Sequence, residues 1–150
     1  MGYELISSFF SLHFHEIPLV ESVHNYISFR DDIVRKGAIS AAAGEPVIIP
    51  LNMAEGSLLG RGKGNRDWNN SAPHGAGRKM SRRQAKKQVP LKDFQRIMKE
   101  HKVWSSSVSK KTLDESPQAY KETKYLKRDL EPSVEITSVL VPVYNFKASS

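Results

Sequence analysis

Hydrophobic and polar residues alternate along the first third of the chain, and this pattern predicts strands. Residues 23–29 (VHNYISF) alternate with a period of two, which is typical of a strand whose two faces differ. After a polar turn at 30–32, we expect residues 33–40 to return as a second strand. The short apolar run at 46–51 (PVIIPL) contains β-branched residues and predicts a third strand.

Further along, the spacing of apolar residues becomes helical. Ser81 stands where an N-cap is expected before a short basic helix over 82–88. After Pro90, apolar residues three or four positions apart predict an amphipathic helix that ends near His101. Residues 134–144 return to strand character. Because strands and helices are mixed without a regular strand–helix–strand repeat, we predict an α+β fold.

A stretch rich in glycine and asparagine, residues 56–77 (GSLLGRGKGNRDWNNSAPHGAG), lies between these elements. The conformational freedom of glycine opposes regular structure, so we expect a long irregular loop here. Loops of this length inside a compact domain are usually functional, so we interpret it as an active-site loop. Its GRGKGN string lacks the spacing and the closing Gly-Lys-Ser/Thr of a P-loop.

The composition narrows the class of protein. The chain has 150 residues, a net charge of +7 and no cysteine, which excludes disulfides and thiolate metal ligands and fits the cytoplasmic location that we expect. No apolar run approaches the roughly 20 residues needed to span a bilayer, so we expect no membrane protein. The apolar stretch at 5–20 lacks a basic start and carries ionisable residues, so it is not expected to be a signal peptide.

The positive charge is concentrated in one segment. Residues 61–102 hold 13 lysines and arginines against three acidic residues, a balance of +10. A concentrated basic field suggests a polyanionic substrate, such as a nucleotide or a nucleic acid. A solvated lysine-rich surface explains the charge equally well.

His74 is the first candidate for chemistry. It is followed by Gly75, Ala76 and Gly77, small residues that leave backbone N–H groups open to a closely approaching anion. An imidazole without bulky neighbours can act as a nucleophile toward phosphorus. On these grounds alone, a lone histidine in a glycine loop is more often structural.

Other histidines are candidates for metal binding. His24 stands beside Asn25 on the first predicted strand, and an imidazole next to a carboxamide could ligate a metal and a phosphate. A strand histidine that is hydrogen-bonded to a neighbour is the simpler interpretation. His13 and His15 form an HxH pair that would project from one strand face, but no convincing pattern of carboxylates accompanies them. Lys147 stands where a core strand would not place a lysine, although exposure at a frayed terminus explains it as well.

Six strings of the chain together resemble the carboxy-terminal part of the RtcB-type RNA ligases, the tRNA-splicing ligase family. They occur in family order and are SVHNYISF (22–29), RKGAISA (35–41), VIIPLNMAEGSL (47–58), GKGNRDWNNSAPHGAGRKMSR (62–82), LDESPQAYK (113–121) and EPSVEITSVLVPVYNFKA (131–148). We therefore divide the chain into a divergent or inserted lead segment, 1–21, and a partial RtcB-like domain, 22–150.

The resemblance implies a ligase reaction. Family members join an RNA 3′-phosphate or 2′,3′-cyclic phosphate to a 5′-hydroxyl, using GTP and Mn²⁺, through a histidine that carries GMP. His74 stands at the position of that nucleophile, and His24 stands at a manganese ligand. The positions that match guanine-nucleotide contacts are Asn25, Pro50, Leu51, Asn52, Met53, Ser57, His74, Gly75, Ala76, Gly77, Tyr120 and Lys147.

The resemblance also implies missing parts. Family members are much longer, and their amino-terminal part supplies an aspartate, a cysteine and two histidines to a two-manganese site. Of all the metal ligands that the resemblance identifies, only His24 is present in this chain, and one imidazole is not a manganese site. We therefore expect a fragment or split subunit that acts on RNA with a separate amino-terminal ligase half. The alternatives are a non-catalytic GTP- or RNA-binding module and an inactive truncated copy.

Overall fold

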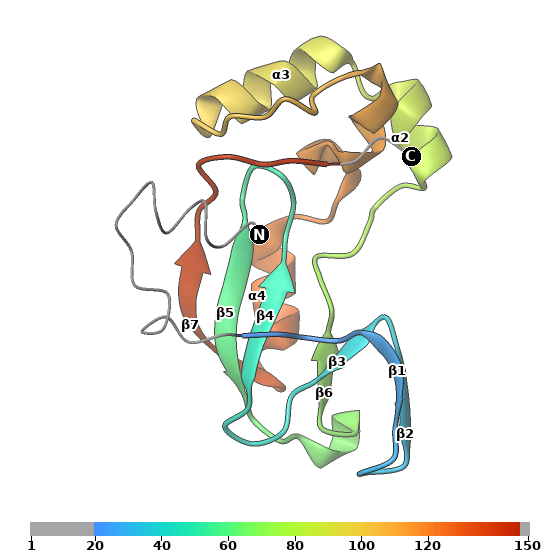
Figure 1. The fold of residues 1–150 in the computed structure, drawn as a ribbon, viewed down its shortest axis with the longest axis vertical. Coiled ribbons are helices and arrows are strands. Elements are labelled where there is room, and N and C mark those ends of the chain that lie inside the picture. The colour runs from blue at the N-terminus through green and yellow to red at the C-terminus, as the bar shows by residue number, and fades with distance from the viewer. Residues whose placement is uncertain (1–19, 148–150) are drawn as a thin grey trace, which may run out of the picture.

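The computed structural model describes residues 20–147, and its centre is a three-stranded antiparallel sheet (Figure 1). The strands β4 (Pro46–Pro50), β5 (Ser57–Gly62) and β7 (Val134–Leu140) lie in the order β4-β5-β7. Helix α4 (Thr123–Leu130) packs behind the sheet in the view of Figure 1. The prediction of a third strand at 46–51 is confirmed, and so is the mixed α+β class.

Four shorter strands form two antiparallel pairs, β1 (Asn25–Ser28) with β2 (Ile33–Lys36), and β3 (Ala38–Ser40) with β6 (Ser71–Pro73). The prediction of one strand over 33–40 is wrong, because Gly37 breaks it into two strands of different sheets. Gly37 has φ +69°, a backbone conformation that residues with a Cβ atom avoid. The chain therefore turns at Gly37, which lies between the end of β2 and the start of β3.

The prediction of a long irregular loop over 56–77 is wrong at two places. Residues 57–62 form the central strand β5, and residues 71–73 form β6. Gly60 and Gly62 stand in this strand because other backbone passes too close for a side chain. A Cβ atom on Gly60 would lie 2.6 Å from the carbonyl oxygen of Glu135, and one on Gly62 would lie 2.3 Å from the carbonyl carbon of Ala41. Glycine here serves close packing and not flexibility.

Helices α2 (Arg82–Gln88) and α3 (Leu91–Glu100) confirm the two predicted helices. Ser81 caps α2 as expected: its side-chain oxygen accepts from the Gln84 amide, and the Gln84 side chain accepts from the Ser81 amide. Helix α4 was not predicted, although Leu126 and Leu130 bury one of its faces. Within residues 20–147, no helix combines the length and the apolar character needed to cross a membrane.

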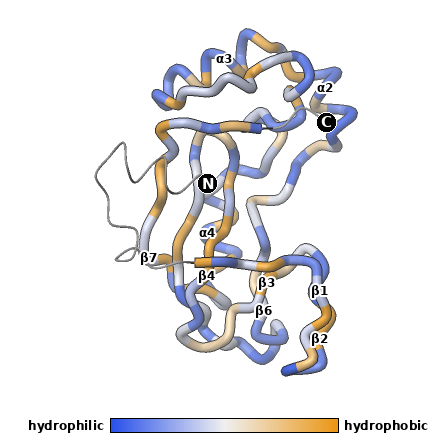
Figure 2. The backbone as a smooth tube through the Cα atoms, in the orientation of Figure 1, coloured by the Kyte–Doolittle hydropathy of each residue, from blue (hydrophilic) through white to orange (hydrophobic). Residues whose placement is uncertain are grey.

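Two hydrophobic clusters hold the fold together. The first joins the central sheet to α4 and includes Ile49, Leu58 and Leu130. The second lies under α2 and α3 and includes Phe94, which is fully buried. Figure 2 shows long hydrophobic stretches on β4 and β7, whereas α2 and α3 are largely hydrophilic. Tyr120 packs against both clusters, so it lies at the junction between the two parts of the fold.

A buried arginine fixes the β1–β2 hairpin to the rest of the chain. Arg35 on β2 is 2% exposed and donates to Asp31 at 2.8 Å, to Ser71 Oγ at 3.0 Å and to the Tyr26 hydroxyl at 3.2 Å. Burial alone would lower the pKa of Arg35, but the bond to Asp31 and the contact with Tyr26 raise it above its ordinary value. Because Ser71 begins β6, this arginine orients the hairpin that carries the first candidate site residues.

Candidate functional site

His74 follows β6 directly and is exposed. Its Nδ1 lies 2.6 Å from the backbone carbonyl oxygen of Gly37. A carbonyl oxygen only accepts hydrogen bonds, so Nδ1 must carry the proton in this contact. In the neutral ring the lone pair then stands on Nε2, which is the nitrogen available to attack an electrophile.

The turn at Gly37 gathers three candidate residues around the backbone of this one glycine. Its N–H donates to the carbonyl oxygen of His24 at 2.8 Å and to Oδ1 of Asn25 at 3.0 Å, while its carbonyl accepts from His74. The side-chain oxygen of Asn25 is therefore engaged by the backbone of this turn. The sequence segments around residues 24 and 74 are thus joined at a single point.

The rings of His24 and His74 are stacked, with centroids 4.9 Å apart and planes 10° apart. The predicted metal ligand therefore lies beside the predicted nucleophile. Among residues 20–147, no three histidine, aspartate or glutamate side chains lie close enough to hold a metal ion together. His13 and His15 lie outside the described residues. The described part of the chain thus offers His24 alone as a ligand at this place.

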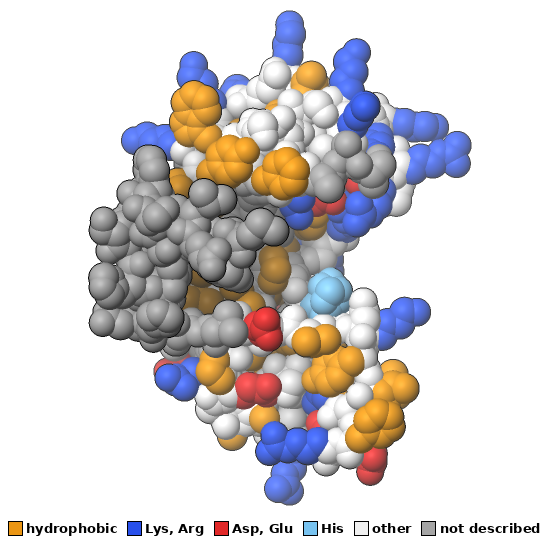
Figure 3. Space-filling model, in the orientation of Figure 1, with side chains coloured by type: hydrophobic (Ala, Val, Ile, Leu, Met, Phe, Trp, Pro, Cys, Tyr) orange, Lys and Arg blue, Asp and Glu red, His pale blue; other side chains and the backbone are white. Residues whose placement is uncertain are grey.

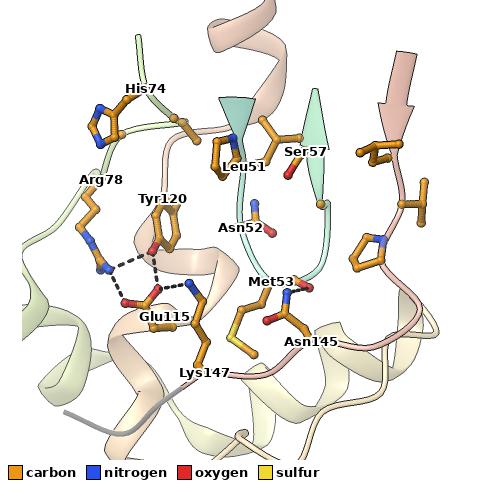
Figure 4. A pocket seen from close by; sticks show the side chains of 18 of the residues that line it. Leu51, Asn52, Met53, Ser57, His74, Arg78, Glu115, Tyr120, Asn145 and Lys147 are labelled. Carbon is orange, nitrogen blue, oxygen red and sulfur yellow. Dashed lines mark hydrogen bonds and ion pairs between the residues drawn. The ribbon is translucent and has the colours of Figure 1, made fainter. Parts of the chain in front are cut away.

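A cavity of about 670 Å³ opens beside His74 (Figure 4). Volumes of a few hundred to about a thousand Å³ are usual for small-molecule sites. Most of the predicted nucleotide-binding residues line it, namely Pro50, Leu51, Asn52, Met53, Ser57, His74, Gly75, Ala76, Gly77, Tyr120 and Lys147. Asn25 and His24 do not line the cavity. Asn25 contacts Gly37, the residue that holds His74, and the ring of His24 stacks on that of His74.

The backbone after His74 runs against the end of β4. The Ala76 amide donates to the carbonyl oxygen of Pro50 at 3.1 Å, and a Cβ atom on Gly75 would lie 3.1 Å from that same oxygen. Gly77 has φ +69° and its carbonyl accepts from the Lys121 amide. This path leaves the amides of Gly75 and Gly77 without an acceptor within residues 20–147. Two N–H groups at the cavity are therefore free for an anion.

The loop between β4 and β5 is closed by hydrogen bonds to the side chain of Asn52. Oδ1 of Asn52 accepts from the amides of Ala54 and Glu55, both at 3.0 Å, which makes a tight turn. Gly56 closes this turn with φ +82°, and a Cβ atom there would collide with the carbonyl oxygen of Leu140 at 1.9 Å. The side chain of Met53 packs in the second hydrophobic cluster. The loop is therefore held by Met53 on one side and by the close approach of Gly56 to Leu140 on the other.

The far wall of the cavity is a network of charges around Tyr120 (Figure 4). Arg78 donates through NH2 to Glu115 and to the Tyr120 hydroxyl, both at 2.9 Å, and its guanidinium lies 4.6 Å from the centre of the Tyr120 ring. The Tyr120 hydroxyl donates to the other oxygen of Glu115 at 2.7 Å. Burial and the hydrogen bond with Glu115 raise the pKa of Tyr120 to about 12. Tyr120 is therefore a neutral phenol at physiological pH.

Lys147 completes this wall from the other end of the chain. Its ammonium nitrogen lies 3.7 Å from Glu115, and its amide donates to Ser107 Oγ at 2.9 Å. Two residues earlier, the side chain of Asn145 donates to the Met53 carbonyl at 3.4 Å. The carboxy-terminal segment is thus tied to both sides of the cavity, and Lys147 faces into it and not away from a frayed end.

Several residues of the wall were not singled out from the sequence as site residues. They are Arg78, Arg82, Glu115 and Asn145. Arg78 directly follows the glycines after His74, and that adjacency is the signal that could have found it. Glu115 and Asn145 are joined to the site only by the folded chain, so their spacing in the sequence gave no indication.

The charges around the cavity are mainly positive. Arg78, Arg82 and Lys147 line it against one carboxylate, that of Glu115. Figure 3 shows a hollow across the middle of one face, with lysine and arginine side chains gathered above it. An exposed imidazole nitrogen, free amides and several cations form a site suited to phosphoryl chemistry on a nucleotide.

The chain is similar to known RNA ligases. Residues 4–148 match the family model of the tRNA-splicing ligase RtcB. Similar proteins include the RNA-splicing ligase RtcB of Escherichia coli (strain K12), 40% identical over 105 residues, which cover 66% of this chain and 25% of that protein. The tRNA-splicing ligase RtcB of Methanocaldococcus jannaschii is 41% identical over 83 residues, which cover 53% of this chain and 9% of that protein. The chain thus spans at most about a quarter of these relatives.

Proposed function

The chain belongs to the tRNA-splicing ligase RtcB family, and from this membership we propose that its cavity is the guanylyl-transfer site of an RNA ligase. The proposed reaction joins an RNA 3′-phosphate, or a 2′,3′-cyclic phosphate after its opening, to a 5′-hydroxyl. GTP supplies the activation. The observation that carries the proposal is the contact of His74 with Gly37, which leaves one imidazole nitrogen ready to react beside a cationic cavity.

In the first proposed step, Nε2 of His74 attacks the α-phosphorus of GTP. An N–P bond forms, the bond to the bridging oxygen breaks, and pyrophosphate leaves with the electron pair. The hydrogen bond from Nδ1 to Gly37 holds the ring in place and stabilises the positive charge that the ring gains. Small neighbours at Gly75 and Gly77 let the phosphates approach the free amides.

In the later steps, the GMP group leaves His74 for the RNA. An oxygen of the RNA 3′-phosphate attacks the histidine-bound phosphorus, which restores the neutral ring. The 5′-hydroxyl of the second RNA end then attacks the activated 3′-phosphate, loses its proton and displaces GMP. Each step is a displacement at phosphorus, so positioning and charge stabilisation contribute more than proton transfer.

The nucleotide would be held by residues at both ends of the cavity. The amides of Gly75 and Gly77 would bind phosphate oxygens, and the positive charge of Arg78 on the neighbouring wall would attract the phosphates. Lys147 and the neutral phenol of Tyr120 lie on the far wall, where the guanine base would be bound. The chemistry of these groups fits a guanine nucleotide, because the base needs donors and stacking and the phosphates need cations.

Manganese fits the described residues less well. His24 would be one ligand, and in the family this metal draws negative charge from the phosphates. One imidazole does not make a site for a hard cation, so the other ligands must come from outside residues 20–147. We propose that an amino-terminal ligase part supplies them, as a separate chain or otherwise. No contact in the site favours a non-catalytic module or an inactive copy instead.

The direct test is incubation with radiolabelled GTP and Mn²⁺, followed by denaturing electrophoresis, with and without an amino-terminal ligase part. We expect an acid-labile, alkali-stable label that His74→Ala removes. His101→Ala is the matched control, since His101 is exposed at the end of α3 and away from the cavity. A label that persists in His74→Ala, or no label even with the amino-terminal part present, would contradict the proposal.

A further inference from the structure

Trp104 is an unusually exposed aromatic residue on the helical part of the molecule, with 80% of its surface accessible. It lines a groove of about 580 Å³ whose apolar residues include Met98, Val103 and Val108. Lys99 and Lys102 line the same groove. A large indole on the surface beside two lysines is not explained by packing, because its ring covers little of the hydrophobic core.

The backbone under this indole is fixed. The Trp104 amide donates to the Val143 carbonyl at 3.0 Å, and the Asn145 amide donates to the Trp104 carbonyl at 2.8 Å, which forms a short parallel bridge. The neighbouring Val103 is buried in the second hydrophobic cluster. A ring carried on a rigid backbone loses little freedom when a flat ligand stacks on it.

The surroundings of the groove are strongly basic. Residues 82–111 contain ten lysines and arginines and two acidic residues. Those two, Asp93 and Glu100, both pair with Arg96. Lys99 and Lys102 are therefore left without an ion pair among residues 20–147. Lysine is depleted in the centres of protein–protein interfaces, so this composition favours a polyanion over a protein partner.

The groove is also linked to the cavity of His74. The segment that pairs with Trp104 continues through Asn145 to Lys147, and both of these residues line the cavity. Asn145 reaches across to the Met53 carbonyl. A strand that leaves the cavity along this segment would therefore meet the indole next.

From this arrangement we propose that Trp104, with Lys99 and Lys102, is a stacking platform for a single-stranded part of the RNA that enters the cavity. One base stacks on the indole, and the adjoining phosphates lie against the two ammonium groups. The platform rests on the proposed ligase function and adds to it the place where the RNA strand is held. Stacking of this kind tolerates any base, so it holds RNA without selecting a sequence.

The two tryptophans of the chain make the test direct. Trp68 is 46% exposed and lies in a short 3-10 helix (Arg66–Trp68) at the other end of the molecule, so it is the matched control (Figure 1). A single-stranded oligoadenylate with a 3′-phosphate is titrated into Trp68→Phe and Trp104→Phe proteins. We expect the fluorescence of Trp104 to be quenched in the first protein and that of Trp68 to be unchanged in the second.

Affinity measurements complete the test. Trp104→Ala should weaken oligoadenylate binding by about tenfold, the loss typical of one stacked base, and Trp104→Phe should restore most of it. Lys99→Gln should reduce the salt dependence of binding, whereas Lys127→Gln on α4 should not. An unchanged affinity of Trp104→Ala for the oligoadenylate would overturn the platform alone. If Trp104→Ala instead reduced self-association of the chain and left the RNA affinity unchanged, Trp104 would be a protein contact, and the platform would also be overturned.

A chain that binds no RNA in any form would overturn both the platform and the RNA substrate of the proposed function. Labelling of His74 by GTP needs no RNA, so it reports separately on the guanylyl-transfer site. A Trp104→Ala protein that still takes the label but binds oligoadenylate weakly is the result that supports the platform.

Discussion

The imidazole of His74 is held by the backbone of Gly37, with 2.6 Å between Nδ1 and the carbonyl oxygen. The two residues belong to segments that are 37 positions apart, and the left-handed turn at Gly37 directs its carbonyl at the ring. The N–H of the same glycine donates to the carbonyl oxygen of His24 and to the side-chain oxygen of Asn25. One turn therefore determines which nitrogen of His74 is free and which residues surround it.

The first prediction concerns the tautomer of His74. Because a carbonyl can only accept, we expect neutral His74 to carry its proton on Nδ1 and its lone pair on Nε2. Long-range proton–nitrogen NMR correlations at mildly alkaline pH distinguish the two forms. His101, whose ring has no acceptor within residues 20–147, should show the ordinary mixture and serves as the reference. A proton on Nε2 of His74 would refute the proposed nucleophile.

The second prediction concerns Gly37. Gly37→Ala should cost about 1–2 kcal/mol of stability, because alanine is strained at φ +69°. It should also reduce guanylylation of His74 and disturb its tautomer, since the carbonyl would be turned away. Gly44→Ala is the control: Gly44 has φ +77° with no atom within 4 Å of an added Cβ. Chemical denaturation should show similar losses for both variants, whereas a normal histidine label in Gly37→Ala would count against the role of the turn.

The sequence predicts those parts of the fold that depend on interactions between residues close together in the chain. Helices α2 and α3 follow from a capping serine and from apolar residues at helical spacing, and both stand where they were expected. Strand β5 was missed because Gly60 and Gly62 read as flexible. Glycine is required at both positions because the backbones of Glu135 and Ala41, which are distant in sequence, pass too close for a side chain. Local propensity cannot report such a long-range contact.

In the candidate site, too, some features could be predicted from the sequence and others could not. The resemblance to a ligase family identified residues that then proved to line one cavity, from Pro50 to Lys147. It did not indicate that Glu115 joins Arg78, Tyr120 and Lys147. These partners come from separate elements, and only the folded chain places their charges within hydrogen-bonding distance. The hydrogen bonds among side chains therefore had to come from the structure.

The third prediction concerns the titration of Tyr120. Its pKa is raised to about 12 by burial and by the hydrogen bond with Glu115. A raised pKa means that folding favours the protonated phenol, so this stabilising contribution is complete below pH 10 or so and is lost as the pH rises through about 12. The tyrosinate absorbance of the unchanged chain minus that of Tyr120→Phe should show the transition.

Glu115→Gln tests the cause of this shift. It removes the carboxylate charge next to the phenol, so the transition of Tyr120 should move to lower pH. A difference titration centred near the ordinary tyrosine value of about 10 in the unchanged chain would contradict the hydrogen bond that the structure shows.

The fourth prediction compares two arginines. Arg78 donates to Glu115 and the Tyr120 hydroxyl and stacks on the Tyr120 ring, and only a planar guanidinium can make all of these contacts. Arg78→Lys should therefore destabilise the chain by about 1–2 kcal/mol, although the charge is kept. Arg96 pairs with Asp93 and Glu100 on the exposed side of α3, so Arg96→Lys should leave the stability nearly unchanged.

Urea denaturation of the two proteins measures this difference, and binding of GMP measures its consequence for the cavity. Arg78→Lys should bind GMP more weakly, because a lysine cannot hold Glu115 and the Tyr120 hydroxyl in place together on the cavity wall. Arg96→Lys should bind GMP as the unchanged chain does. Equal stability and equal GMP affinity in the two variants would mean that the charge of Arg78 matters and its geometry does not. In that case the network around Tyr120 would have no part in shaping the site.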